Sequence, residues 1–438
     1  MKTILNVEYG GIHAAYWMYY GVVASFNAAF LLARGYTNSE IGIILAVASV
    51  LSVLIQPLLA DLADRSRRLD VIGVSQISTL VLMAAGAGLF LFREKSLPLW
   101  LLYVLVSAGL LALQPLLNSL CFKLEESGHH VNFGICRSCG SLGYALFVIL
   151  LGVMVEKSGA GILPVAGEVT LGALLIILVL VKKSFFEAMV RKKYGENVIG
   201  VIGDYIDITR DEPDTGAAAA AGAIEAGDEA GKPVEAPAAR EDINLAEFVR
   251  RNRLFVALNL AIIVLFFQNY IANNYMLQLV EGVGGDAADM GRIFSVMAFM
   301  EIPGLFFFEK IAKRFSLESL LIFSAFAFVA KFAVIYIAES VFMLYVAHIF
   351  QAVSFPIFLS GMVAYTDGCM SKGEAVKGQS LYTACITVSS VFAGVLGGIM
   401  LDMAGPKFMA GVSTISAVAG AVLVTLILQK MKKSGKQK

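Results

Sequence analysis

The sequence predicts an all-α membrane protein whose twelve transmembrane helices form two pseudo-symmetric six-helix bundles. Of its 438 residues, 58% are hydrophobic and only 16% are charged, which is too little charge for a soluble chain of this length. Twelve apolar stretches are each long enough to cross a bilayer, and landmark residues recur in both halves. Backbone groups in lipid must bond to one another, so each span is expected to be a helix.

The twelve predicted spans form two groups of six, separated by a polar segment in the middle of the sequence. Each contains about 20 mainly apolar residues, as a membrane-crossing helix requires. They cover residues 10–33, 39–60, 70–92, 97–121, 135–155, 161–181, 254–280, 289–308, 317–338, 340–366, 377–401 and 406–429. Most Lys and Arg residues outside the spans lie on the side of both termini, a bias that marks the cytoplasmic side. We therefore expect a multi-pass cell-membrane protein with cytoplasmic termini and no removable signal peptide.

This polar segment is predicted to be a cytoplasmic linker at residues 182–253. It separates an N-terminal bundle at residues 1–181 from a C-terminal bundle at 254–438. The start of the linker is expected to extend the sixth helix, and its end, INLAEFVRRNRL, to form an interfacial helix. The segment between them is rich in Ala, Gly, Glu and Pro and has too few large apolar residues to fold. We interpret the linker as a flexible tether, with regulation or partner binding as the alternative.

Landmark residues at equivalent helices indicate that the two halves are related. The segment IQPLLADLADRSRR follows span two, and IPGLFFFEKIAKRF follows span eight in a similar way. Three residue pairs have similar separations along the chain: Pro57 with Pro303, Pro115 with Pro356, and Gly134 with Gly378. Duplicated six-helix units of this kind place a substrate site between them, near the bilayer midplane.

Composition and motifs argue against several other functions. The 34 Lys and Arg residues balance 34 Asp and Glu residues, so nucleic acid is not an expected partner. No phosphate-binding Gly loop, nucleophile elbow or HExxH motif is present, and we expect neither an enzyme nor a cofactor. His129, His130, Cys136 and Cys139 offer a zinc-like ligand set, but the spacing is irregular and Cys is common in membrane helices. We therefore expect no metal.

Four motifs resemble those of the major facilitator superfamily. LLARGYTNSEIGIILAVASVLSVLIQPLLADLADRSRR is similar to its helix one–two segment and its cytoplasmic G-x-L-x-D-R-x-G-R-R loop, although Ala60 replaces the preferred Gly and the later Gly is missing. FGICRSCGSLGY, MEIPGLFF and HIFQAVSFPIF resemble the helix-five, helix-eight and helix-ten motifs of the lactose-permease-like branch. The resemblance covers nearly the whole chain except the linker. It implies a functional monomer that carries a sugar or nucleoside with a proton by alternating access.

Ionisable residues inside the predicted spans are candidates for function because their burial in lipid is costly. Glu301 lies close to the middle of its span, and an apolar environment disfavours an ionised carboxyl group, so it can exchange a proton. The resemblance implies that Glu301 contacts the sugar and couples transport to protons. His348 is three residues from Gln351 and shares its helix face, and Lys331 aligns with a helix-nine Arg of the branch.

Neutral residues stand at several positions where the branch has charged ones. Gln351, Gln268 and Asn118 replace acids, and Tyr345 replaces a Lys. An amide cannot titrate, so the coupling mechanism stays open. The predicted coupling residues are Glu301 and His348.

Arg137 lies at the entrance of span five, and Tyr144 follows two turns later on the same face. The resemblance implies that this Arg binds sugar hydroxyls and that the aromatic ring stacks on the sugar. Two kinds of partner are open for Arg137: Asn118, or one of the acids Glu125, Glu126 and Glu301. The alternative is a cation that reaches the membrane interface.

Polar uncharged side chains are dense in the predicted spans one and seven, which suits a small neutral solute. Contacts between helices are the alternative use of such groups. The predicted substrate-binding residues are Arg137, Tyr144, Asn118, Gln268, Asn269, Asn273, Glu301, Lys331, His348, Gln351, Asn27 and Tyr20.

Acidic and basic residues alternate after span two, where Asp64, Arg65 and Arg68 are predicted to latch the cytoplasmic gate. A solvated anchor of positive charge is the alternative. The functional prediction is a proton-coupled transporter of a sugar or nucleoside in the lipid bilayer. Two alternatives remain: an uncoupled uniporter or exporter of amphipathic compounds, and a non-transporting membrane sensor.

Overall fold

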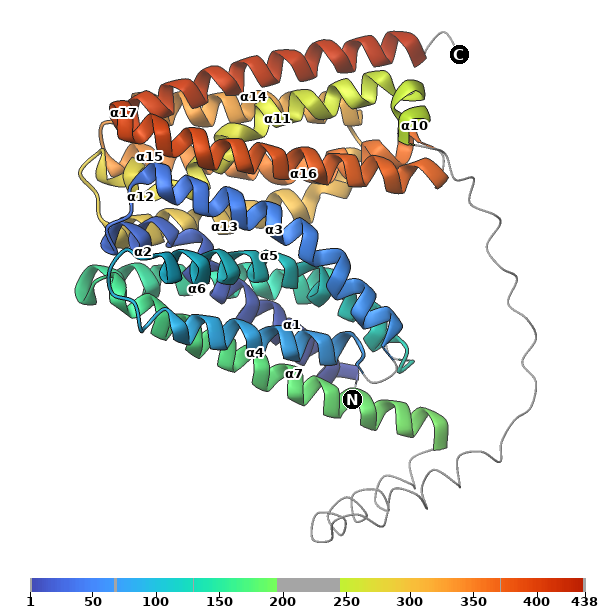
Figure 1. Ribbon diagram of the computed structural model, residues 1–438. Coiled ribbons are helices and arrows are strands. Elements are labelled where there is room, and N and C mark those ends of the chain that lie inside the picture. The colour runs from blue at the N-terminus through green and yellow to red at the C-terminus, as the bar shows by residue number, and fades with distance from the viewer. Residues whose placement is uncertain (1, 67–68, 129, 195–244, 371, 436–438) are drawn as a thin grey trace.

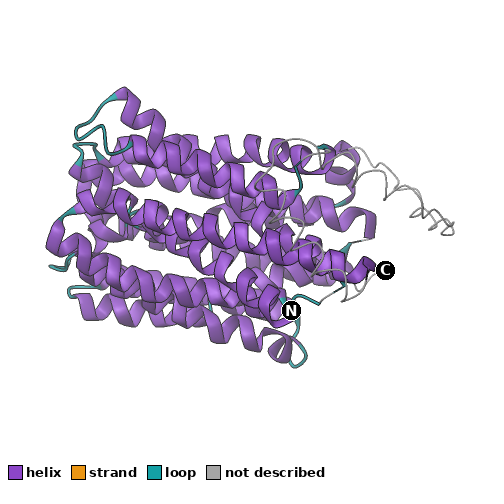
Figure 2. Ribbon diagram, turned by 90° about the horizontal axis from the view of Figure 1, so that it is seen from below, coloured by secondary structure: helices purple, strands orange, loops and turns teal. Residues whose placement is uncertain are grey.

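The computed structural model describes residues 2–66, 69–128, 130–194, 245–370 and 372–435, and this part of the chain is helical without a strand (Figure 1). Figure 2 shows the helices running side by side along one common direction. Both termini lie at the same end of the molecule (Figure 1). The predicted all-α fold with two bundles is confirmed, whereas most of the predicted linker lies outside the described residues.

The N-terminal bundle begins with a helix that is interrupted once and continues with five long helices. Side-chain caps start several of them: Thr37 forms a capping box with Glu40, and Asp70, Ser96 and Asn132 each accept a bond from a first-turn amide. The elements are α1 (Lys2–Tyr20), the π-helical turn η1 (Gly21–Ser25), α2 (Asn27–Ala33), α3 (Asn38–Arg65), α4 (Val71–Gly88), α5 (Leu97–Glu125), α6 (Phe133–Ser158), η2 (Ala160–Ile162) and α7 (Leu163–Tyr194).

In the described part of the C-terminal bundle, two of the membrane-crossing helices are interrupted, one at Tyr275 and one at Phe350–Ala352. Its elements are α10 (Leu245–Arg251), α11 (Arg253–Asn274), α12 (Met276–Glu281), α13 (Ala287–Ala312), α14 (Leu317–Ile337), α15 (Val341–Ile349), η4 (Phe350–Ala352), α16 (Phe355–Cys369) and α17 (Lys372–Gly435). Two antiparallel helices make up α17, because Gly405 adopts a φ of 76° between them and Pro406 follows.

Ten stretches of the described chain are long and apolar enough to cross a membrane. The last of them, Glu374–Lys433, holds both halves of α17. The first predicted span corresponds to α1, η1 and α2; α1 has 19 residues but contains the polar residues Asn6, Glu8 and His13, so it is less apolar than the other spans. The arrangement is therefore consistent with twelve crossings.

The structure differs from the predicted spans mainly at helix interruptions. The first helix begins at Lys2 rather than near residue 10 and passes through a π turn. The tenth span breaks at η4 because Pro356, near the start of α16, has no amide hydrogen to donate. The predicted extension of the sixth helix is confirmed, since α7 reaches Tyr194.

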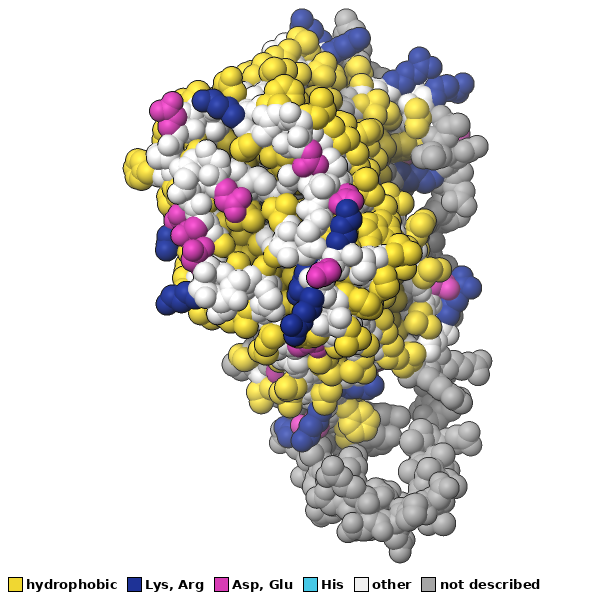
Figure 3. Space-filling model, turned by 60° about the vertical axis from the view of Figure 1, so that its left-hand side comes forward, with side chains coloured by type: hydrophobic (Ala, Val, Ile, Leu, Met, Phe, Trp, Pro, Cys, Tyr) yellow, Lys and Arg dark blue, Asp and Glu magenta, His cyan; other side chains and the backbone are white. Residues whose placement is uncertain are grey.

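Large apolar side chains cover the outside of the helices, as expected for a surface against lipid tails. Leu58, Phe306 and Met403 are 68%, 78% and 77% exposed. Figure 3 turns the end opposite the termini forward and shows hydrophobic side chains along the flank, with acidic and basic groups scattered over the forward end. The exposed apolar surface supports a multi-pass membrane protein.

The two bundles meet where α3 packs on α17 and α6 packs on α13. Glycines permit the close approach: a Cβ atom on Gly42 would overlap the carbonyl oxygen of Gly394, and one on Gly291 would overlap that of Val148. These contacts lie in the half of the molecule opposite the termini. They position the site described next.

Candidate functional site

A central cavity with about 680 Å³ of open space lies between the two bundles. The N-terminal bundle contributes Tyr20, Asn27 and Tyr144, and the C-terminal bundle contributes Tyr270 and Asn273. Of the described residues that line this cavity, none is charged. Hydroxyl and amide groups on an otherwise apolar wall suit a neutral molecule with several hydrogen-bonding groups.

A wider cavity, about 1570 Å³ including its opening to solvent, continues from the central one. The two share the lining residues Ser49, Leu111, Tyr270 and Ser390. It also reaches Asp367 near the end of α16 and Ala375 near the start of α17. Those helix ends lie on the side of the termini (Figure 1). The centre of the molecule is therefore open toward the end that carries both termini.

The opposite end is closed by hydrogen bonds between the bundles. The Asp402 carboxylate on α17 accepts bonds from the backbone amides of Asn38 and Ser39, at 3.2 and 2.8 Å, and from both side chains. These amides belong to the first turn of α3, whose positive dipole end favours an anion. Gln278 adds a 2.7 Å bond from its amide nitrogen to the Asn38 side-chain oxygen.

Aromatic rings form the N-terminal wall of the site. Trp17 lies 4.9 Å from Tyr20 and 6.4 Å from Tyr144, measured between ring centroids. The Tyr144 hydroxyl is 2.8 Å from the Ser25 hydroxyl of η1. Arg137 places its guanidinium carbon 4.2 Å from the Trp17 ring centroid, a cation–π contact. The face shared by Arg137 and Tyr144 therefore points toward one aromatic cluster.

A buried hydrogen-bond network in the C-terminal bundle joins three of the predicted residues. The Lys331 ammonium donates to the Gln351 side-chain oxygen at 2.7 Å, and the Gln351 amide nitrogen donates to Glu301 at 2.8 Å. Lys331 and Gln351 are almost inaccessible, at 0% and 1% exposure. Gln351 thus acts as a neutral bridge between a buried cation and a carboxyl group.

His348 is fully buried beside this network. Its Nδ1 atom lies 2.7 Å from the carbonyl oxygen of Leu344, and its Nε2 atom has no hydrogen-bond partner in the described part of the chain. A ring with one free nitrogen keeps the capacity to bond a solute or water. Its predicted role in coupling stays a prediction.

Glu301, in the hydrogen-bond network of the C-terminal bundle, interacts electrostatically with residues of the N-terminal wall. It interacts with Arg137 and with the cavity-lining Tyr20 and Tyr144 across the bundle interface. Two other acids considered for Arg137 are engaged elsewhere, because Glu125 pairs with His130 and Glu126 with Lys123. Within the described residues Arg137 has no hydrogen bond to Asn118.

The predicted amides occupy three different environments. Asn27 and Asn273 line the central cavity. Gln268 and Asn269 are buried at 0% and 3% exposure and do not line it. Asn118 lines a separate pocket beside the α5–α6 loop. The structure therefore brings Arg137, Tyr144, Tyr20, Asn27, Asn273 and the Glu301 network to the bundle interface, but not all of the predicted amides.

Comparison with known proteins identifies the family. Residues 9–410 match the family described as MFS_1 like family. The chain belongs to this family of major facilitator transporters. Maltose permease from Geobacillus stearothermophilus is 22% identical over 434 residues, which span 96% of this chain and 95% of the permease.

Solved structures of major facilitator transporters share the fold. The nucleoside transporter NupG aligns with a TM-score of 0.66 and 13% identity over 98% of this chain and 99% of NupG. A point mutant of the peptide transporter POT, in complex with alafosfalin, aligns with a TM-score of 0.69 and 13% identity over 99% of this chain and 95% of POT. These likenesses show the shared fold, and the family match over residues 9–410 shows that the chain is a membrane transporter of small molecules and not an enzyme.

The predicted gate of this major facilitator is exposed at the open end. Arg65 forms an ion pair with Asp61, one helical turn earlier, and both side chains are more than half exposed, at 81% and 53%. Asp64 is exposed, and Arg68 lies outside the described residues. The latch stays a prediction for the state in which this end is closed.

The structure also shows the surroundings of Glu168 and of the zinc-like residues. Glu168, in the predicted span 161–181, is partly buried, and one of its carboxyl oxygens is buried without a hydrogen-bond partner in the described chain. Of the zinc-like residues, Cys136 is buried and donates to the backbone of Asn6, whereas Cys139 is exposed. His129 lies outside the described residues, and among the residues that the structure describes there is no cluster of three such ligands.

Trp17, Tyr270 and Asp402 belong to the site but were missed in the sequence. Trp17 is one of only two Trp residues and precedes Tyr20 by three positions, a spacing that puts both on one helix face. Asp402 stands at the end of a helix, where the dipole disfavours an acid. A carboxylate in this position needs a bonding partner on another element, and this requirement could have identified Asp402 from the sequence.

Asp402→Asn is expected to loosen the closed end, because the amide loses the charge that favours the α3 amides. A helix-end charge is worth about 1 kcal/mol, so the state open at this end should become roughly fivefold more populated. The measurement is labelling of an Asn273→Cys reporter from that end with an impermeant maleimide, in a background with Cys139 and Cys369 replaced by Ser.

Glu339→Gln supplies the control, because Glu339 is an exposed acid in the α14–α15 loop. It should leave the labelling rate unchanged. Equal rates in Asp402→Asn and the parent would show that the carboxylate does not hold this end closed.

Proposed function

We propose that this transporter carries a small neutral polar solute, a sugar or nucleoside, together with a proton. The observation that carries the proposal is the uncharged central cavity, open to one end only, with a buried carboxyl network at its edge. A sugar offers hydroxyls to Asn27 and Asn273 and an apolar ring face to Tyr20 and Tyr144. The named relatives that transport maltose and nucleosides are consistent with such a solute.

A peptide is a less suitable solute for this cavity. Both termini of a peptide are charged, and burying a charge without a counter-charge is costly. The described lining of the central cavity carries no charged side chain. Arg137 and Glu301 lie at the bundle interface, where they are already opposed to one another.

Proton coupling is proposed to operate through the charge balance around Glu301. The ionised carboxylate balances Lys331 through the Gln351 bridge and attracts Arg137 across the interface. A proton on Glu301 removes that attraction, and the two bundles are then free to rock against each other. In this mechanism Gln351 does not titrate but holds the carboxyl and the ammonium groups at a fixed separation.

The orientation proposed here has both termini in the cytoplasm of a cell-membrane monomer, so the structure corresponds to an inward-open state. The basic residues on the side of the termini support this orientation. The two bundles enclose the site without a second copy of the chain.

The experiment is uptake by proteoliposomes of labelled maltose, uridine and dialanine, with and without an inward proton gradient. Accumulation of maltose or uridine that collapses with a protonophore is the expected result. Equilibration without accumulation would indicate a uniporter, preferential dialanine uptake would overturn the neutral-solute proposal, and saturable solute binding without any flux would indicate a sensor.

Arg137 lies at the bundle interface beside the cavity rather than in its described lining, and we propose that it reaches the solute when the solute binds. Arg137→Ala is then expected to weaken solute binding by about ten- to hundredfold, the range for a lost charge-assisted hydrogen bond. Binding is measured by calorimetry with the solute identified above. Arg251→Ala is the control, because Arg251 is 54% exposed and pairs with Glu247 on α10. Parental affinity in the Arg137 variant would place the solute elsewhere.

A further inference from the structure

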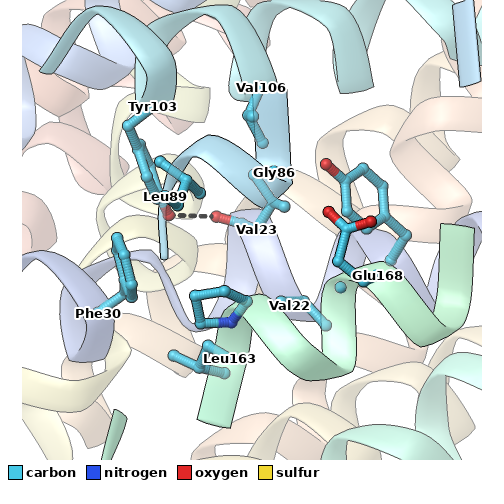
Figure 4. A pocket seen from close by; sticks show the side chains of 12 residues that line it. Val22, Val23, Phe30, Gly86, Leu89, Tyr103, Val106, Leu163 and Glu168 are labelled. Atoms are coloured by element: carbon cyan, nitrogen blue, oxygen red, sulfur yellow. Dashed lines mark hydrogen bonds between the residues drawn. The ribbon is translucent and has the colours of Figure 1, made fainter. Parts of the chain in front are cut away.

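A second pocket lies inside the N-terminal bundle, between α1, η1, α2, α4, α5 and α7, and contains about 350 Å³ of open space. Figure 4 shows Val22, Val23, Phe30, Leu89, Tyr103 and Leu163 around it, with Glu168 at its edge. Val23 also lines the central cavity. Only the polypeptide around η1 therefore separates this pocket from the solute site.

Two polar groups in this apolar pocket lack partners in the described chain. The Tyr19 hydroxyl is buried, on a side chain that is 2% exposed, and has no hydrogen bond. The Oε1 atom of Glu168 is likewise buried without a hydrogen bond. Buried polar atoms almost always have a partner, because an unmet hydrogen bond costs about 1–3 kcal/mol. Two of them at one pocket are therefore available to bond a molecule held there, whether water or a larger ligand.

The backbone is shaped to leave room for the carboxyl group. Gly86 of α4 faces Glu168, and a Cβ atom at this position would overlap the Oε1 atom. The opposite wall is rigid, because Phe30 and Tyr103 stack at 5.5 Å between centroids and Tyr103 donates a 2.9 Å bond to the Val23 carbonyl oxygen (Figure 4).

The chemistry of the walls restricts the ligand. A carboxylate next to a phenol oxygen provides acceptors for an N–H donor with positive charge, and the aromatic pair and aliphatic side chains provide an apolar surface. An aromatic ring also attracts a cation over its face. An anion would meet the carboxylate, and a purely apolar molecule would leave both polar groups unpaired.

We propose that this pocket is a second binding site, distinct from the solute cavity, for a small organic ammonium ion held by Glu168 and Tyr19. The ammonium group donates to the Glu168 carboxylate and to the Tyr19 oxygen, and the hydrocarbon part lies against Leu89 and Phe30. No bond is made or broken. The site does not depend on the identity of the transported solute.

The test compares benzylammonium with benzyl alcohol, which has a similar apolar body without the charge. Binding is measured by calorimetry on the purified full chain in lipid nanodiscs. Benzylammonium is expected to bind saturably and at least about tenfold more tightly than benzyl alcohol, since a charged hydrogen bond is worth about 1.5–3 kcal/mol. Equal affinities, or no saturable binding of benzylammonium, would overturn the proposal.

Three variants locate the site. Glu168→Gln keeps the size of the side chain and should reduce benzylammonium affinity about tenfold, while Tyr19→Phe removes one acceptor and should reduce it less. Glu156→Gln, at an exposed acid of α6, should have no effect. Unchanged benzylammonium affinity in a folded Glu168→Gln protein would contradict the assignment. If that variant does not fold, unchanged affinity in Tyr19→Phe would contradict it instead. Failure of uptake in the transport assay leaves this binding result unaffected.

Discussion

Glu301→Gln is expected to abolish solute uptake driven by a pH gradient while solute exchange across the membrane continues. The amide can still accept the hydrogen bond from Gln351 but cannot take up or release a proton. It also lacks the charge that attracts Arg137 across the interface. The measurement is gradient-driven uptake and counterflow by the same proteoliposomes, with the solute identified for the parent protein.

Glu309→Gln is the matched control, because Glu309 lies two turns further along α13 and is exposed. The same chemical change there should leave both activities at the parental level. Gradient-driven uptake that survives in Glu301→Gln would remove Glu301 from the coupling mechanism.

The Glu301 variant also leaves the buried Lys331 without a nearby anion. Removing one member of a buried charge pair destabilises a protein by about 3–5 kcal/mol, so a folding defect has to be separated from a coupling defect. The double variant Glu301→Gln with Lys331→Met removes both charges. It should recover thermal stability relative to Glu301→Gln but not gradient-driven uptake, because no titratable carboxyl group is restored.

Hydropathy predicted the order of the helices because lipid forces every spanning segment to satisfy its own backbone bonds. The helix interruptions were harder to predict from the sequence. Pro356 was noted as a landmark, but the turn at η4 extends over the preceding residues, and η1 contains no proline at all. A π turn depends on what packs against it, here Tyr103 on Val23 and Tyr144 on Ser25, and those partners come from other helices.

The sequence predicted those site residues whose burial in a membrane span is costly by itself. It predicted less well the residues whose role depends on which neighbour they contact. A carboxyl group and an ammonium group in apolar spans are conspicuous, so Glu301 and Lys331 were found. Gln351 suggested a lost proton site, whereas its position shows a bridge between these two groups. Gln268 and Asn273 belong to one amide-rich helix, and only the packing of α11 separates the buried amide from the cavity-lining one.

Gly42→Val is expected to shift the transporter toward the state open at the end opposite the termini. In the present state a side chain at Gly42 would overlap the Gly394 carbonyl oxygen and lie 2.8 Å from the Tyr275 hydroxyl, which itself bonds to that carbonyl group. Backbone atoms cannot move aside as a flexible side chain does. Overpacking costs about 1–3 kcal/mol, so the ratio of the two states should change by a factor of about 5 to 150.

The Asn273→Cys reporter described above measures this shift as faster labelling from the end opposite the termini. Gly172→Val is the matched control, because a Cβ atom on Gly172 of α7 would meet no atom within 4 Å. Gly291→Val should act like Gly42→Val through the separate contact of α13 with α6, where the overlap is with Val148. If both interface variants label at the rate of the control, the close glycine contacts do not determine which end is open, and alternating access would require another hinge between the bundles.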